Sequence, residues 1–334
     1  MRVCWNGTNL VAPFHFVFAR IKTYVYMELH KIECRMCMAR VVGIGKQSFE
    51  KIIKEECFYI DKTAFIKEWW ENKGDVTLIT RPRRFGKTLN MDMIKCFFSN
   101  EYKDRGDLFE GLDIWKEEKY RELQGTYPMI FLSFVEIKTK NFKDTREQIC
   151  FQIVKMYNEN DYLYDSGVLN DNEKKFFKSI SMVMSDAVLS VAINQMCCFM
   201  HKYYGKKVII LLDEYDTPMQ EAYVNGYWEE LVGFTRSLFN STFKTNPYLE
   251  RAIMTGITKA EYSALGKFAK QTSNGSALAE TMSKESIFSD LNNIVVVTTT
   301  SDLYETAFGF TEQEVFNALD EFELSDKKDD GNTS

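Results

Sequence analysis

The octapeptide RPRRFGKT, residues 81–88, has a composition suited to binding phosphate. It follows an apolar run and precedes a helical pattern, and a strand, a tight loop ending in Gly-Lys-Thr and a helix together form a P-loop. Main-chain N–H groups at such a loop and helix start cradle phosphate oxygens. We therefore expect Arg84, Phe85 and Gly86 to line a bound ATP. Lys87 then reaches the β- and γ-phosphates and serves catalysis, and the Thr88 hydroxyl binds Mg²⁺.

Two adjacent acids, Asp213 and Glu214, end a second apolar run, VIILLDE, at residues 208–214. A Walker B strand ends in this way, with Asp213 holding Mg²⁺ and Glu214 orienting or deprotonating the attacking water. The alternative is an ordinary strand end at which the chain leaves the core. Combined with Lys87 and Thr88, the acids favour a nucleotide site. The run PMIFLSF, residues 128–134, intervenes, and we predict a Walker B strand separated from the Walker A strand by one strand.

Several other positions have both a functional and a plain structural interpretation. The commonest P-loop has a glycine where this chain has Arg81, and Pro82 stiffens the turn. Arg81, Arg83 and Arg84 either add positive charge beside a triphosphate or form a solvated loop face. Thr255 and Thr258 are either sensors of the γ-phosphate or common strand-end residues. Arg236 and Arg251 either supply transition-state charge or are cations without that role. Phe58 or Tyr59 is either a ring that stacks on the base or a core residue.

The elements that must position these groups are predicted by five apolar runs, at residues 76–80, 128–134, 208–214, 251–257 and 293–300. Continuous Val, Ile and Leu runs are typical of strands covered on both faces. The helical stretches between them are long enough for crossovers, so we predict an α/β fold, a three-layer P-loop NTPase sandwich with a mainly parallel central sheet. A packing stripe on a further helix is predicted at Trp228, Leu231, Val232, Thr235, Leu238 and Phe239.

The composition excludes several classes of protein. With 45% hydrophobic residues and only five Pro in 334 residues, the chain is neither collagen-like nor wholly disordered. A net charge of -6 argues against a surface that binds nucleic acid throughout. Eight dispersed Cys favour reduced cytoplasmic thiols, and Cys34 and Cys37 beside His30 lack the second ligand pair of a zinc site. No apolar run is long enough to span a membrane.

The chain divides into three predicted parts. Residues 1–41 form a basic appendage, either packed on the body or acting as a nucleic-acid arm, residues 42–324 form the main domain, and residues 325–334 form a polar tail. Residues 260–282, rich in Ala, Ser and Thr, are predicted to be an exposed insertion in the main domain.

Five segments together make the chain similar to a known family: FYIDKTAFIKEWW, LITRPRRFGKTLNMDMI, VIILLDEYDTPMQEAY, YLERAIMTGIT and SKESIFSDLNN. They closely resemble the bacterial AAA-ATPase-like family over residues 42–324. In that family Arg-Pro-Arg-Arg-Phe-Gly-Lys-Ser/Thr is the normal loop, which implies that Arg81 is a family variant. The resemblance also implies Walker A roles for Lys87 and Thr88 and Walker B roles for Asp213 and Glu214. In this chain residues 260–282 separate the sensor region from the SKESIFSD segment.

Members of that family commonly continue into a nuclease-like domain of the PD-(D/E)XK type. The printed sequence ends before such a domain, so we carry over no nuclease activity. Our first hypothesis is a cytoplasmic protein that binds ATP with Mg²⁺ and hydrolyses it. The alternatives are a nucleotide-responsive or structural interaction module without useful turnover, and a piece of an ATPase that handles nucleic acid. An unidentified nucleic-acid or protein partner stays open, and no membrane partner is expected.

Overall fold

The five apolar runs form the central sheet of the computed structural model, which describes residues 40–43, 45–256 and 291–325. The strands are β1 (Val76–Thr80), β2 (Met129–Ser133), β3 (Val208–Asp213), β4 (Leu249–Gly256) and β5 (Ile294–Val297). Neighbouring strands all pair in parallel, in the order β2-β3-β4-β1-β5. Every residue of β1 and β3 is buried, because helices cover both faces of the sheet. The predicted α/β fold with a parallel sheet is confirmed.

The order of the strands differs from their order along the chain. β4 lies between β1 and β3, whereas β2, which comes between them in the sequence, lies at the edge beside β3. Thr80 pairs with Gly256 and Leu212 with Met254. The carboxyl ends of β1, β4 and β3 therefore meet at one edge of the sheet, where open α/β sheets bind their ligands.

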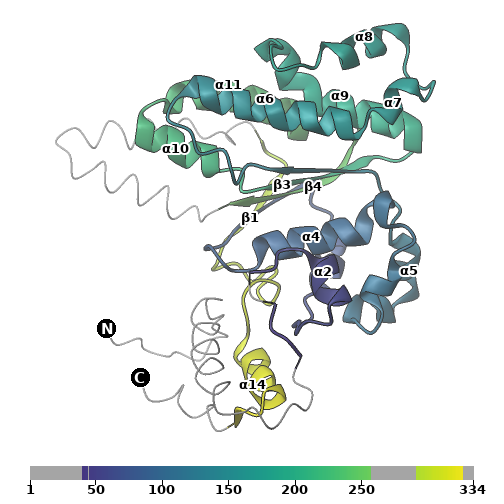
Figure 1. Ribbon diagram of the computed structural model, residues 1–334, viewed down its shortest axis with the longest axis vertical. Coiled ribbons are helices and arrows are strands. Elements are labelled where there is room, and N and C mark those ends of the chain that lie inside the picture. The colour runs from purple at the N-terminus through teal and green to yellow at the C-terminus, as the bar shows by residue number, and fades with distance from the viewer. Residues whose placement is uncertain (1–39, 44, 257–290, 326–334) are drawn as a thin grey trace, which may run out of the picture.

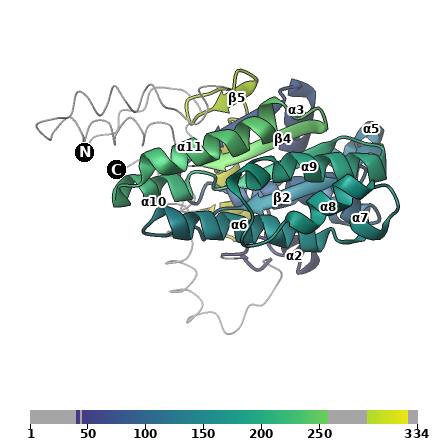
Figure 2. The same cartoon turned by 90° about the horizontal axis from the view of Figure 1, so that it is seen from above.

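Two layers of helices enclose the sheet (Figure 1). The long helices α6, α9 and α11 lie on one face, where Figure 2 shows them from above, and α2, α4 and α5 lie on the other. The helices are α2 (Phe49–Lys54), α3 (Ala64–Asn72), α4 (Lys87–Phe98), α5 (Glu118–Leu123), α6 (Phe142–Glu159), α7 (Tyr162–Asp165), α8 (Asp171–Ser179), α9 (Asp186–Tyr204), α10 (Thr217–Asn225), α11 (Trp228–Phe239) and α14 (Glu312–Glu321). Shorter turns are the 3-10 segments η1 (Asn100–Tyr102), η2 (Gly106–Phe109) and η3 (Asp113–Lys116) and the π-helical segment η4 (Asn240–Lys244).

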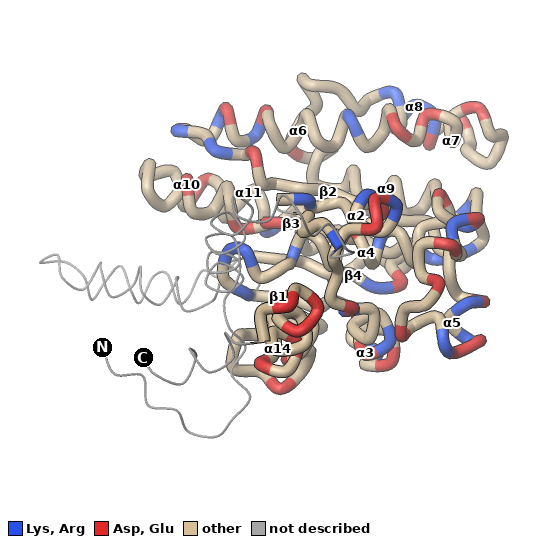
Figure 3. The backbone as a smooth tube through the Cα atoms, turned by 60° about the horizontal axis from the view of Figure 1, so that its bottom comes forward, with Lys and Arg blue, Asp and Glu red and all other residues tan. Residues whose placement is uncertain are grey.

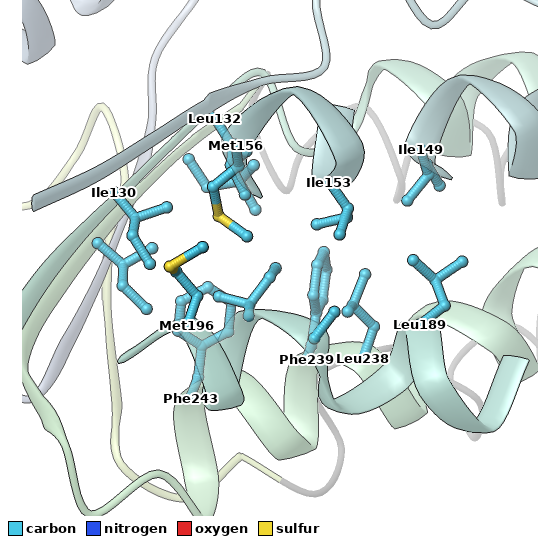
Figure 4. Packing of buried hydrophobic residues seen from close by; sticks show 14 of the residues in the cluster. Ile130, Leu132, Ile149, Ile153, Met156, Leu189, Met196, Leu238, Phe239 and Phe243 are labelled. Atoms are coloured by element: carbon cyan, nitrogen blue, oxygen red, sulfur yellow. The ribbon is translucent and has the colours of Figure 1, made fainter. Parts of the chain in front are cut away.

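Each face of the sheet has its own apolar core. Successive side chains of β3 alternate between them: Ile210 and Leu212 belong to one core, Ile209 and Leu211 to the other. Figure 4 shows the first core, in which side chains of α6, α9 and α11 meet those of β2. The predicted packing stripe of α11 is confirmed: Leu231, Val232, Thr235, Leu238 and Phe239 are buried, and Trp228 is partly buried and packs against the same core. The second core is rich in aromatic rings, among them Phe49, Phe65, Trp69, Phe97, Phe98 and Phe109.

Acidic and basic residues are interspersed over the described part of the chain (Figure 3), and α14 carries several acids. The five cysteines in that part are buried free thiols. No helix among the described residues is long and apolar enough to cross a membrane. The predicted appendage at residues 1–41 falls almost wholly outside the described residues, as do Cys34, Cys37, Thr258, the segment 260–282 and the tail from residue 326.

Candidate functional site

The loop that joins β1 to α4 contains residues with left-handed backbone conformation. Gly86 is the N-cap of α4 and has a φ of 78°, a value that favours glycine because it has no Cβ. An added Cβ at Gly86 would meet no atom within 4 Å, so the backbone conformation and not crowding requires glycine here. Arg84 also has a positive φ, 68°. The twelve-residue α4 thus begins directly at the loop, and the positive end of its dipole faces the loop residues.

Lys87 lies inside this loop, only 5% exposed. Its ammonium donates to the main-chain oxygens of Arg81, at 2.9 Å, and Pro82, at 3.1 Å. Burial lowers the pKa of Lys87, and the nearby carboxylates of Glu214, Asp216 and Asp213 oppose that shift. Lys87 at the start of α4 therefore interacts electrostatically with the acids at and just beyond the end of β3.

Asp213 joins the loop to β3 and β4. Its Oδ2 accepts a hydrogen bond of 2.9 Å from the Thr88 hydroxyl, although the two residues are 125 positions apart in the sequence. Its Oδ1 accepts a hydrogen bond from the Thr255 hydroxyl at the end of β4. Asp213 is 2% exposed and Thr255 is fully buried. The structure thus brings Thr88, Asp213 and Thr255 together into one polar cluster.

Glu214 follows β3 with a φ of 50°, an uncommon conformation for a residue other than glycine. Two side-chain hydroxyls hold it: its N–H donates to the Thr255 hydroxyl at 3.1 Å, and its Oε2 accepts from the Thr217 hydroxyl at 3.1 Å. Its main-chain oxygen also accepts from the Thr217 N–H at 3.1 Å. Such strained backbone is found where the surroundings impose it, often at active sites. Thr217 was not among the predicted residues, and its only sequence signal is its position three residues after Glu214.

The arginines of the loop divide into two kinds. Arg83 and Arg84 are exposed, whereas Arg81 is only 4% exposed. The solvated-face interpretation is therefore wrong for Arg81. Its guanidinium donates to the main-chain oxygen of Val297 at 3.2 Å and lies over the Phe308 ring, 5.6 Å from its centre. Burial lowers the pKa of Arg81 to about 10, so the side chain stays charged at neutral pH.

Three other candidates contact residues away from this cluster. Arg251 stacks on Trp70 at 4.5 Å and lies nearer the amino end of β4 than Thr255 does. Phe58 packs against Phe322, with ring centres 5.0 Å apart, and Tyr59 packs against Phe49 at 5.5 Å. These contacts favour the core-packing interpretation of both rings. Arg236 lies on α11.

The oxygen atoms of Thr88 and Asp213 are suitable ligands for a magnesium ion that is bound together with a nucleotide. Among the described residues, no group of three or more His, Cys, Asp and Glu side chains is arranged to hold a metal by itself. Mg²⁺ in nucleotide sites is bound through one or two protein oxygens together with phosphates and waters. The Thr88 hydroxyl and the Asp213 carboxylate, already 2.9 Å apart, are donors of this kind.

Comparison with known proteins places the chain in a family. A family model described as "Predicted AAA-ATPase" matches residues 43–265, which is more than half of the chain. The chain belongs to this family. The resemblance predicted over residues 42–324 is thus matched as far as residue 265.

The chain is also similar to a protein of Azotobacter chroococcum mcd 1 described as "Uncharacterized protein in vnfD 5'region". The two are 25% identical over 275 residues, which cover 81% of this chain and 43% of the relative. The chain thus spans less than half the length of that relative. No solved structure matches the chain.

Proposed function

We propose that this protein binds ATP together with Mg²⁺ and hydrolyses the bond between the β- and γ-phosphates. The observation that carries the proposal is the hydrogen bond between Thr88 and Asp213, because it joins the Gly-Lys-Thr sequence to the acid that ends β3. The strand order supports it too, since β4 lies between β1 and β3. We identify β1 and β3 as the Walker A and Walker B strands of a three-layer P-loop fold.

In this proposal each side chain has a separate task. Lys87 is placed by the main-chain oxygens of Arg81 and Pro82 and donates its remaining N–H to oxygens of the β- and γ-phosphates. Thr88 and Asp213 hold Mg²⁺, which when bound neutralises phosphate charge. Arg84, Phe85 and Gly86 line the phosphates with the amino end of α4.

The water that attacks the γ-phosphate needs a base, and we assign this role to Glu214. Thr217 holds one of its carboxylate oxygens, and the Thr255 hydroxyl holds its main-chain N–H. The Thr217 contact restrains the carboxylate itself, and the Thr255 contact fixes the main chain from which the side chain projects, so together they position the base. Thr255 also contacts Asp213, so it links the metal-binding acid to the base.

Two substitutions separate binding from turnover. Lys87→Ala should abolish binding of a fluorescent ATP analogue in the presence of Mg²⁺. Glu214→Gln should retain binding but lower phosphate release by at least 100-fold, because a positioned base contributes about 10²–10⁴ in rate.

Lys51→Ala and Glu230→Gln are the matched controls, since both residues are exposed and lie on other helices. Both controls should behave like the wild type. Failure of the wild type to bind Mg²⁺–ATP would overturn the proposed function. Equal phosphate release by the wild type and Glu214→Gln would remove only the role of the base.

A further inference from the structure

Arg81 stands at the loop position where the commonest P-loop has glycine, and its side chain is turned into the protein. Its guanidinium contacts the main-chain oxygens of Thr80, at 3.4 Å, and Val297, at 3.2 Å. The Phe308 ring lies under it at 5.6 Å. None of the ion pairs among the described residues involves Arg81. Its partners are therefore backbone dipoles and an aromatic face.

The segment after β5 contacts the same loop through its main chain. The N–H of Gly309 donates to the Phe85 oxygen at 3.3 Å, and the Asn90 amide donates to the Ala307 oxygen at 2.7 Å. Phe308 stands between these two bonds and is 2% exposed. Val297 and residues 307–309 all lie beyond residue 265, where the family match ends.

The main chain of Arg81 is part of the lysine site. Its oxygen accepts the 2.9 Å hydrogen bond from Lys87, and the next oxygen, of Pro82, accepts the 3.1 Å bond. A side chain that fixes Arg81 between β5 and Phe308 therefore also fixes the two oxygens that place Lys87. A planar guanidinium suits this task because it stacks on a ring and donates along its edge at the same time.

We propose that Arg81 is a positioning residue of the nucleotide site, clamped by Val297 and Phe308, and that the segment after β5 is thereby part of that site. The inference rests on the proposed function. It explains how an arginine can stand where the commonest P-loop has glycine. The side chain points away from the phosphate side of the loop and holds the turn through its contacts with Val297 and Phe308.

The test compares Arg81→Lys, Arg81→Met, Phe308→Leu and the double variant Arg81→Met/Phe308→Leu. Affinity for a fluorescent ATP analogue with Mg²⁺, the KM and kcat of phosphate release, and Tm are measured for each. Lysine keeps the charge but cannot stack as a plane, and leucine keeps apolar volume but has no ring face. Arg81→Lys and Phe308→Leu, which each keep part of the original side chain's character, keep the test valid if Arg81→Met fails to fold.

We expect each single variant, including Arg81→Lys, to weaken binding about tenfold and to raise KM, with kcat within twofold of the wild type. The double variant should bind no more weakly than Arg81→Met, because each substitution already removes the shared contact. The matched control is Phe65→Leu, since Phe65 packs on Phe308 at 5.2 Å in the same core. It should lower Tm without changing the affinity.

Three results would overturn the inference. They are wild-type affinity in Arg81→Lys, additive losses in the double variant, and unchanged affinity in Arg81→Met and Phe308→Leu despite a lower Tm. In each case the wild type binds Mg²⁺–ATP, so the proposed function survives. Absence of binding by the wild type would overturn both.

Discussion

At the scale of single residues, Thr255 connects the two consecutive acids of the site. Its hydroxyl donates to Asp213 Oδ1 and accepts from the N–H of Glu214, and it is fully buried. One small side chain therefore supplies a hydrogen-bond partner to both Asp213, the last residue of β3, and Glu214, the residue after it. A buried polar group that loses such partners costs more than the bond itself contributes, because no water replaces them.

Replacing Thr255 by Val should therefore damage stability and turnover together. Valine has the shape of threonine but leaves the Asp213 oxygen and the Glu214 N–H without this partner. We expect a loss of about 1–3 kcal/mol in the free energy of unfolding, measured by urea denaturation, and a lower kcat for phosphate release. Thr255→Ser keeps the hydroxyl and should retain most of both. Equal behaviour of the two variants would show that the hydroxyl is not the important group.

At the scale of elements, the carboxyl ends of β3 and β4 approach too closely for a side chain at Gly256. A Cβ there would lie 2.6 Å from a ring carbon of Tyr215 and 2.9 Å from the Asp216 carboxyl carbon. The chain after β3 can turn across the end of β4 only because this position has no side chain. That turn carries Glu214 and its positive φ.

Gly256→Ala should move the turn after β3. Overpacking of this kind costs about 1–3 kcal/mol, so we expect a lower Tm and a larger loss in turnover than in nucleotide binding. Gly233→Ala is the matched control: Gly233 lies within α11, and an added Cβ would meet nothing within 4 Å. Since alanine favours helix, this control should be neutral or slightly stabilising. A Gly256→Ala variant as active as Gly233→Ala would contradict the close approach.

At the scale of the whole molecule, two ion pairs join the amino-terminal part of the described chain to its carboxyl-terminal part: an exposed one between Arg40 and Glu321, and a more buried one between Lys62 and Glu314. Lys62, just before α3, donates to both carboxylate oxygens of Glu314 in α14, at 2.6 and 2.7 Å, and to the Thr306 oxygen at 2.7 Å. The Lys62 side chain is 9% exposed and that of Glu314 is 24% exposed. Glu314 also closes the capping box of α14 with Thr311. The pair therefore fixes α14 and the segment after β5 to the body.

Lys62→Met should destabilise the protein by about 2 kcal/mol, because it leaves a partly buried carboxylate without its cation. Adding Glu314→Gln should recover part of this loss, since glutamine removes the charge and still completes a capping box. The measurement is thermal or urea denaturation. Lys67→Met is the control, because the Lys67–Glu117 pair is about 40% exposed on each side and such pairs contribute about 0–1 kcal/mol. Equal losses in Lys62→Met and Lys67→Met would rule out the proposed tie.

Much of the sheet could be predicted from the sequence, for a local reason. Strands buried on both faces are continuous Val, Ile and Leu runs, and all five runs form strands. The stripe that starts at Trp228 likewise predicted α11. The order of the runs in the sequence did not predict the order of the strands in the sheet. β2 lies at the edge beside β3, and β4 lies between β3 and β1, because strand positions depend on how the crossovers pack.

The sequence by itself determined the local elements: the five strands, the Gly-Lys-Thr turn and the acids that follow a buried strand. These depend on residues that are neighbours in the chain, so composition and spacing record them. Only the tertiary structure decided that Thr88, Asp213 and Thr255 meet, that Arg81 is buried against Phe308, and that residues 307–309 contact the loop. Those contacts join segments far apart in the chain, and their formation depends on the packing of the whole sheet and its helices, which no short motif encodes.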